Sequence, residues 1–202
     1  MREGKEKIVE KTWHLPTQAN KVAKSRIERI IESAKGPLVL DIGAGQSFNT
    51  VALRKSFPKV ISVDRRKRNK DTGERIDTAC DVLNGLPFPD SYADTIVAGE
   101  FLEHLLKPYE FLLECKRVLK RNGRLIMTTP NATGYQNVFR SRGRRTLTAH
   151  CYCWSPDELN HLVRKSGFEI VKTETFFERF WFLNFLPMKF KSTMLIVCKS
   201  KK

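Results

Sequence analysis

The sequence has 202 residues, of which 41% are hydrophobic and 29% charged, and its formal net charge is +15. This length and composition are typical of one globular domain, and no apolar run approaches the roughly 18 to 20 residues that span a bilayer. The five cysteines are scattered along the chain, an odd number that argues against a disulfide framework. We therefore expect a cytoplasmic protein with reduced thiols. The positive charge favours either an anionic partner or a well-solvated surface.

The first predicted element is an amphipathic helix over 17–35, which ends at a Gly-Pro pair. It lies in an expected N-terminal extension over residues 1–36, which precedes a main domain over residues 37–202. The predicted strands of that domain cover 38–40, 60–63, 76–80, 95–98, 124–128, 168–175 and 193–199. Predicted helices end near residue 57 and cover 109–120 and 156–165. This alternation predicts a Rossmann-like, doubly wound α/β sheet of seven strands, mostly parallel, whose last strand is antiparallel because the last connection is too short for a crossover helix.

A glycine turn follows the first predicted strand, where Asp41 leads into Gly43 and Gly45. In a doubly wound sheet, ligands bind beyond the carboxyl ends of the strands, and glycines let them approach the backbone. The amides of the next helix can hold a carboxylate or a phosphate. The third glycine of a dinucleotide-binding turn falls on Phe48, and the Asp41 carboxylate repels a pyrophosphate but attracts an ammonium group. The turn therefore favours an amino acid moiety over NAD.

Acidic residues follow the next two predicted strands. Asp64 ends the second strand, where a carboxylate can accept hydrogen bonds from both ribose hydroxyls. Asp81 follows the third strand, where its carboxylate can accept a hydrogen bond from an exocyclic amine. The backbone amide of Val82 lies beside it. Together these positions predict an adenosine pocket.

These motifs resemble those of the class I S-adenosylmethionine-dependent methyltransferases, most closely the subgroup called methyltransferase type 11. The resemblance covers about residues 36–199 and is carried by residues 39–45, 64, 80–82, 86–90, 100–105, 117–125 and 129–131. It implies an enzyme that moves the methyl group of S-adenosylmethionine to an O, N or C nucleophile and leaves S-adenosylhomocysteine. Ser47 departs from the family pattern, which often has a third glycine there.

The resemblance also implies the site residues. The implied cofactor-binding residues are Asp41, Gly43 and Gly45 around the methionine part, Asp64 at the ribose, Asp81 and Val82 at the adenine, and Glu100 after the fourth strand. His104 and His150 are the candidate catalytic residues, as proton acceptors for a hydroxyl substrate, although each can equally be a packing residue. The Cys151 and Cys153 pair lacks the spacing of zinc knuckles, so we expect no metal site.

The sequence says less about the methyl acceptor than about the cofactor. A small molecule is slightly favoured over RNA or another polyanion, and a noncatalytic S-adenosylmethionine-binding domain is an alternative of another class. A basic cluster after the fifth strand either contacts an anionic partner or is a solvated loop. It comprises Arg140, Arg142, Arg144 and Arg145. The aromatic-rich segment 176–187 favours core or dimer packing over contact with an apolar substrate or a membrane surface. We expect a monomer or a homodimer.

Overall fold

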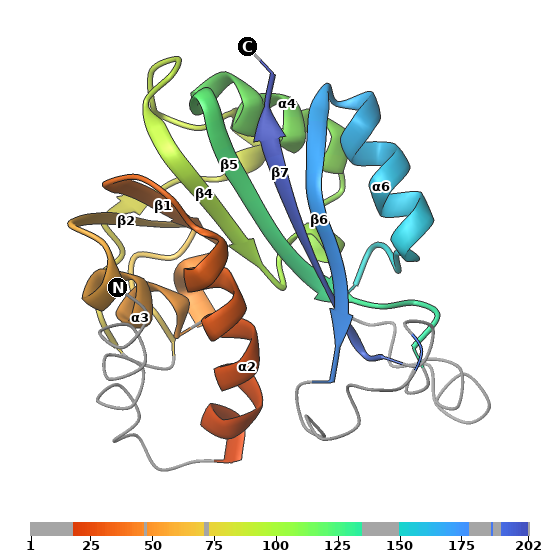
Figure 1. Cartoon of the computed structure of the whole chain (residues 1–202). Helices are drawn as coiled ribbons and strands as arrows, with labels where there is room; N and C mark the ends of the chain where they lie inside the picture. The colour runs from red at the N-terminus through yellow and green to blue at the C-terminus, as the bar shows by residue number, and fades with distance from the viewer. Residues whose placement is uncertain are drawn as a thin grey trace.

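A computed structural model of the chain describes residues 18–46, 48–70, 73–134, 150–177, 187 and 191–201. These residues form a seven-stranded sheet with the order β3-β2-β1-β4-β5-β7-β6 (Figure 1). The strands are β1 (Leu38–Ile42), β2 (Lys59–Asp64), β3 (Thr78–Ala79), β4 (Ala93–Gly99), β5 (Leu119–Pro130), β6 (Phe168–Phe176) and β7 (Thr193–Ser200). Neighbours from β3 to β5 are parallel, and β7 is antiparallel to both β5 and β6. The predicted Rossmann-like sheet with an antiparallel last strand is confirmed.

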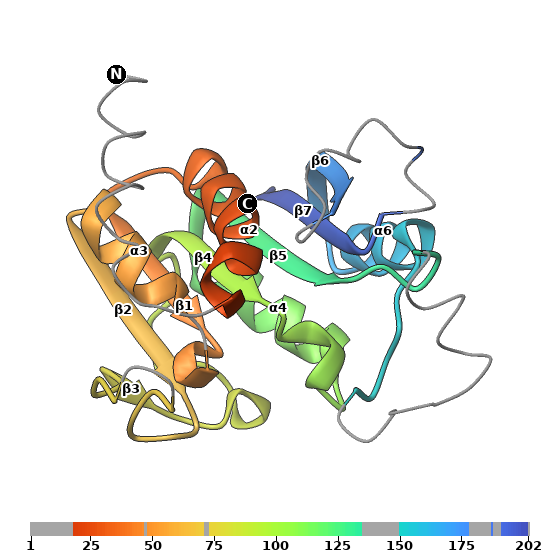
Figure 2. The same ribbon diagram turned by 90° about the horizontal axis from the view of Figure 1, so that it is seen from below.

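Helices cover both faces of the sheet, which is why its central strands are apolar on both sides. The described helices are α2 (Gln18–Ser33), α3 (Asn49–Ser56), α4 (Pro108–Val118) and α6 (Pro156–Lys165), with short 3-10 turns η1 (Ala44–Gln46), η2 (Val82–Asn84) and η3 (Leu102–His104). Figure 2 shows α2 and α3 on one side of the sheet and α4 on the other. Along β1, Val39 joins the core under α2 and α3, whereas Leu40 and Ile42 join the core with α4 and α6. None of the described helices is long and apolar enough to cross a membrane.

Local sequence signals explain most element boundaries. Helix α6 begins at Pro156 because Ser155 caps it: the Ser155 hydroxyl accepts from the amide of Glu158, whose carboxylate accepts in turn from the amide of Ser155. Helix α2 buries Ile27, Ile30 and Ile31 against the same core as β1. The helix of the expected extension therefore packs on the sheet of the main domain.

Two predicted boundaries were wrong. The third strand has two residues rather than five. Strand β5 begins at Leu119 rather than at residue 124, because Leu119 pairs with Ala93 of β4 before the strand bulges. Asn122 has a φ of 63° there, so the Asn122-Gly123 pair marks an irregular position inside a strand and does not close a helix.

The sheet has a switch point between β1 and β4. From β1 the chain passes to β2 on one side, whereas β4 pairs with β1 on the other side. The arrows of β4 and β5 end at one edge of the sheet and the arrow of β7 runs the opposite way (Figure 1). Connections that leave β1 in opposite directions open a crevice at the carboxyl edge, where such folds bind their ligands.

Candidate cofactor and active site

A cavity of about 640 Å³ lies at this carboxyl edge. Its volume is within the range of small-molecule sites. The cavity wall includes Gly43 after β1, Asp64 at the end of β2, Asp81 and Val82 after β3, Glu100 after β4, and Arg26 from α2. Residues from five separate segments thus meet at one site, and the order of the strands accounts for the four that follow strands.

The glycine turn leaves no room for a side chain. Gly43 has a φ of 79°, and a β-carbon there would overlap the ring of Phe101. A β-carbon on Gly45 would lie 2.6 Å from the Asp64 carboxylate carbon. The Gly45 amide donates instead to Asp64 Oδ2 at 2.9 Å, so the turn after β1 holds the carboxylate at the end of β2.

Asp64 is 9% exposed and lines the cavity. Its Oδ2 accepts from the Gly45 amide, and its Oδ1 accepts from the Arg66 amide at 2.8 Å. Each carboxylate oxygen has two lone pairs, so one acceptor position on each oxygen is left for a ligand. Two acceptors held in a fixed plane match the two adjacent hydroxyls of a ribose.

Asp81 lies at the start of η2 and is exposed at the cavity wall. Its Oδ1 accepts from the Leu83 amide at 3.0 Å, which fixes the carboxylate and leaves its other oxygen for a ligand amine. Val82 is buried beside it. This arrangement agrees with the predicted adenine contact, and the contact itself stays a prediction.

Asp41 lies beneath the glycine turn and does not line the cavity. It is fully buried, and its Oδ2 accepts from the Thr50 hydroxyl at 2.5 Å. Its Oδ1 has no hydrogen-bond partner among the described residues. Burial raises the pKa of Asp41 to about 7, and the Thr50 hydrogen bond opposes that rise. A cofactor ammonium would have to reach Asp41 through the turn, and this predicted contact also stays a prediction.

Glu100 follows β4 with a φ of 51°, a conformation that is rare for residues other than glycine and that concentrates at functional sites. Its amide donates to the Thr128 carbonyl at 2.9 Å, which fixes the turn to β5. Its Oε1 lies 3.8 Å from Nη1 of Arg26. Helix α2 therefore contributes a cation to the cavity that the sequence analysis did not identify.

His104 and His150 come together, although they lie far apart in the sequence. Their ring centroids are 4.8 Å apart, with the rings nearly perpendicular. His104 lines the cavity, and His150 lies against it from the segment before α6. Burial, and then the neighbouring His104, lower the pKa of His150.

Glu103 is the second residue that the sequence analysis missed, after Arg26. It is 1% exposed, and neither of its carboxylate oxygens has a hydrogen-bond partner in the part of the chain that the structure describes. Burial raises its pKa to about 8, and the charge of Glu100 adds to that rise. The nearby Thr129 hydroxyl opposes the rise without reaching hydrogen-bond geometry. The only feature of the sequence that could have indicated a buried Glu103 is its place between two leucines at helical spacing. Both of them, Leu102 and Leu105, are buried in the structure.

Other predicted features lie partly or wholly outside the described residues. The arginines Arg140, Arg142, Arg144 and Arg145 lie outside them. Of the aromatic segment 176–187, Phe176 and Phe177 are described and buried. Phe176 belongs to the core cluster under α2, and the Arg29 guanidinium lies 4.5 Å from the centroid of its ring.

Comparison with known proteins finds relatives among the methyltransferases. The model of the methyltransferase-domain family matches residues 16–173. The chain is 28% identical over 152 residues to a probable S-adenosylmethionine-dependent methyltransferase of Mycolicibacterium smegmatis, a match that covers 72% of this chain and 57% of that protein. It is 27% identical over 161 residues to a ubiquinone biosynthesis O-methyltransferase of Roseobacter denitrificans, covering 72% of this chain and 65% of that protein. The chain thus spans less than two thirds of the length of these relatives.

Solved structures agree on the fold. An S-adenosylmethionine-dependent methyltransferase from Archaeoglobus fulgidus superimposes with a TM-score of 0.69 at 23% identity, and the match covers 89% of this chain and 93% of that one. The [4+2]-cyclase SpnF superimposes with a TM-score of 0.67 at 18% identity, covering 91% of this chain and 82% of that one. This fold therefore also carries chemistry other than methyl transfer. Because the family model covers most of the sequence, the chain belongs to the methyltransferase-domain family of class I S-adenosylmethionine-dependent methyltransferases, as its motifs predicted.

Proposed function

We propose that this protein binds S-adenosylmethionine in the carboxyl-edge cavity and transfers its methyl group to a small molecule. The observation that carries the proposal is the state of Asp64. Its carboxylate is fixed in the cavity wall by two backbone amides, with an acceptor position left on each oxygen. A purely structural carboxylate would lie against protein or bulk solvent, whereas Asp64 lines a cavity of cofactor size.

The positions of the residues that line the cavity suggest how the cofactor lies in it. The ribose lies on Asp64, and the adenine lies toward Asp81 and Val82. The methionine part then runs past Gly43 toward Glu100, with Asp41 beneath the turn. This direction places the sulfonium methyl group near the end of β4, on the side of His104.

The protein has little covalent chemistry to perform, because the sulfonium already activates the methyl group. A lone pair of the acceptor attacks the methyl carbon, the carbon–sulfur bond breaks, and its electron pair stays on sulfur as S-adenosylhomocysteine forms. The site must hold the two reactants in line and exclude water. The Phe101 ring lines the cavity beside Gly43, where its face can stabilise the cationic sulfur. We place the acceptor on the side of His104 and His150, the two proposed catalytic residues.

A small acceptor is supported by a cavity of about 640 Å³ and by the Roseobacter denitrificans relative, whose name specifies ubiquinone biosynthesis. The polyanion alternative depends on arginines that lie outside the described residues. A cytoplasmic location stays a prediction, supported by five cysteines that are all free thiols. A monomer or homodimer likewise stays a prediction.

Calorimetric titration with S-adenosylhomocysteine tests the proposal. We expect binding of S-adenosylhomocysteine and no binding of NAD by the wild type. In Asp64→Asn the affinity for S-adenosylhomocysteine should be about 5- to 150-fold lower, because the substitution removes a charged acceptor (about 1–3 kcal/mol). Asp157→Asn is the matched control, because Asp157 is exposed on α6 away from the cavity. Tight NAD binding, or equal affinities of the folded Asp64→Asn variant and the wild type, would refute the proposed site.

A further inference from the structure

We propose that Glu103, His104 and His150 bind a divalent transition-metal ion on the acceptor side of the cavity. The expectation from sequence was that the chain holds no metal. Binding of the ion is independent of the reaction. The role of the ion rests on the proposed methyl transfer.

The three residues offer ligand atoms in the right arrangement. One carboxylate oxygen and two imidazole nitrogens lie within 4.8 Å of one another. Ligands about 2.1 Å from a common ion in tetrahedral geometry stand about 3.4 Å apart, so side-chain rotations that shorten these separations by up to about 1.4 Å complete the site. Among the described residues this is the one such group of three. Cys151 and Cys153 belong to no such group among the described residues.

The buried carboxylate is the second observation. Glu103 is 1% exposed, and both of its oxygens lack hydrogen-bond partners in the described chain. A buried carboxylate without partners is costly, and buried charges in native proteins are normally paired or bound to metals. One carboxylate oxygen of Glu103 is also the one that lies with the two imidazoles. A cation between these groups supplies the missing partner.

The site is also held in place by the backbone. The Glu103 carbonyl accepts from the amides of Cys151 at 2.7 Å and Tyr152 at 3.2 Å. The thiol of Cys151 lies 3.6 Å from the carbonyl of His104. These contacts tie the segment that carries His150 to the turn that carries the other two ligands. The imidazoles are therefore brought together without the ion, as preorganised metal sites require.

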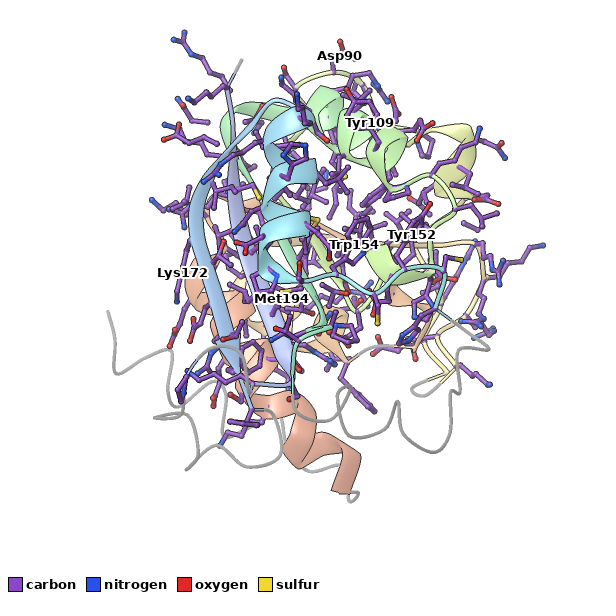
Figure 3. The ribbon with its side chains drawn as sticks, turned by 90° about the vertical axis from the view of Figure 1, so that its right-hand side faces the viewer. Asp90, Tyr109, Tyr152, Trp154, Lys172 and Met194 are labelled. Atoms are coloured by element: carbon purple, nitrogen blue, oxygen red, sulfur yellow. The ribbon has the colours of Figure 1, made fainter. Side chains whose placement is uncertain are left out.

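The next residues of the same segment extend this attachment. Figure 3 shows Tyr152 and Trp154 beside each other on the segment that leads into α6. Their rings stack with centroids 5.0 Å apart, and the Tyr152 hydroxyl donates to the carbonyl of Leu106 at 3.3 Å. The Ala132 amide donates to the carbonyl of Trp154 at 2.8 Å, so the segment is also joined to the end of β5.

The charge balance favours a cation. A second carboxylate, that of Glu100, lies three residues before Glu103 and lines the cavity together with His104. Arg26 offsets part of this negative charge from 3.8 Å, and Glu100 Oε1 is buried without a hydrogen-bond partner of its own in the described chain. The ligand set decides the type of ion: two imidazoles and one carboxylate suit Zn²⁺, Fe²⁺, Co²⁺ or Mn²⁺ better than Mg²⁺ or Ca²⁺, which prefer oxygen ligands.

Three protein ligands leave coordination positions open, and His104 lines the cavity. An acceptor hydroxyl bound at an open position loses its proton to water more readily, because the ion lowers its pKa. The resulting oxygen lone pair forms the new O–CH₃ bond while the C–S pair remains on sulfur, and the ion is neither oxidised nor reduced. The acceptor class is therefore a hydroxyl compound, and the imidazoles act on it through the ion rather than by taking the proton themselves.

Titration of the full chain with Co²⁺, followed by visible absorption, tests the site without cofactor or acceptor. We expect one equivalent to bind with the visible bands of nitrogen and oxygen ligation, and Zn²⁺ to displace it. Glu103→Gln, which preserves shape, and His150→Ala should weaken binding at least about tenfold, because each removes a ligand. His161→Ala is the control, because His161 is an exposed histidine on α6 that lies outside this group.

Three results would overturn the metal site: no Co²⁺ binding, equal affinity in the folded Glu103→Gln variant, or an intense near-ultraviolet thiolate band that places the ion on Cys151 or Cys153. Glu103→Gln decides the matter if His150→Ala does not fold. Affinity for S-adenosylhomocysteine is measured on the same samples. A wild type that binds S-adenosylhomocysteine but no Co²⁺ contradicts the metal site alone, whereas a wild type that binds no S-adenosylhomocysteine contradicts the proposed function.

Discussion

Replacement of the buried Asp41 by asparagine should change how the stability of the protein depends on pH. The carboxyl group of Asp41 is fully buried, and burial raises its pKa from an ordinary value of 3.8 to about 7. Between these pH values the folded state keeps a proton that the unfolded state has lost. The free energy of unfolding of the wild type therefore falls as pH rises from about 4 to about 7. The neutral Asp41→Asn variant lacks this contribution.

The size of the effect follows from the same shift. At about 1.4 kcal/mol per pKa unit, the difference between 3.8 and about 7 corresponds to a ceiling of about 4 kcal/mol. The side-chain carbonyl of the introduced asparagine can still accept from the Thr50 hydroxyl, so that hydrogen bond survives. The amide group of the introduced asparagine has no partner, which lowers the free energy of unfolding by about 1–3 kcal/mol at every pH. This constant term does not change how the free energy of unfolding depends on pH.

Urea unfolding at a series of pH values from 4 to 8, followed by circular dichroism, measures the difference between the two proteins. We expect the free energy of unfolding of Asp41→Asn, relative to that of the wild type, to rise by up to about 4 kcal/mol from pH 4 to pH 8. Titrations elsewhere in the chain cancel in the difference. A difference that stays constant from pH 4 to pH 8 would show that Asp41 is ionised in the folded state, and the reasoning from burial would be refuted.

Three further substitutions have defined consequences. Gly45→Ala should reduce affinity for S-adenosylhomocysteine at least about tenfold in calorimetry, because its β-carbon displaces the Asp64 carboxylate; unchanged affinity would contradict the close contact. Ser155→Ala should lower stability to urea by about 0.5–2 kcal/mol through loss of the cap with Glu158, and no change would mean that the cap is dispensable. Leu112→Ala should cost about 2–5 kcal/mol in the same assay because Leu112 is fully buried, and a cost below about 1 kcal/mol would contradict its packing.

The sequence predicted the fold well where local signals and topology agree. Helix α6 begins and ends at the predicted residues because Ser155, Pro156 and Gly167 are local start and stop signals. Strand β5 was misjudged at its start because Asn122-Gly123 is equally typical of a helix end and of a strand irregularity. Only the pairing of Leu119 with Ala93, a tertiary contact, decides between them.

The candidate site divides in the same way. Asp64 and Asp81 could be predicted, because the ends of consecutive strands must meet at one edge of the sheet. Glu103 could not be predicted. Its carboxylate is buried without a hydrogen-bond partner among the described residues, and this depends on how η3 packs against the segment before α6. Arg26 could not, because nothing in an amphipathic helix shows which of its polar residues faces a distant turn.

The central claim is methyl transfer from a cofactor bound at Asp64, and one measurement tests it most directly. S-adenosylmethionine with a labelled methyl group is incubated with the protein and a cell extract, which is then separated into small-molecule and macromolecular fractions. We predict that the wild type transfers label to a compound in the small-molecule fraction other than S-adenosylmethionine, and that Asp64→Asn transfers much less at limiting cofactor. Label that stays on S-adenosylmethionine in every fraction, from a wild type that binds S-adenosylhomocysteine, would contradict the claim that the protein is a methyltransferase.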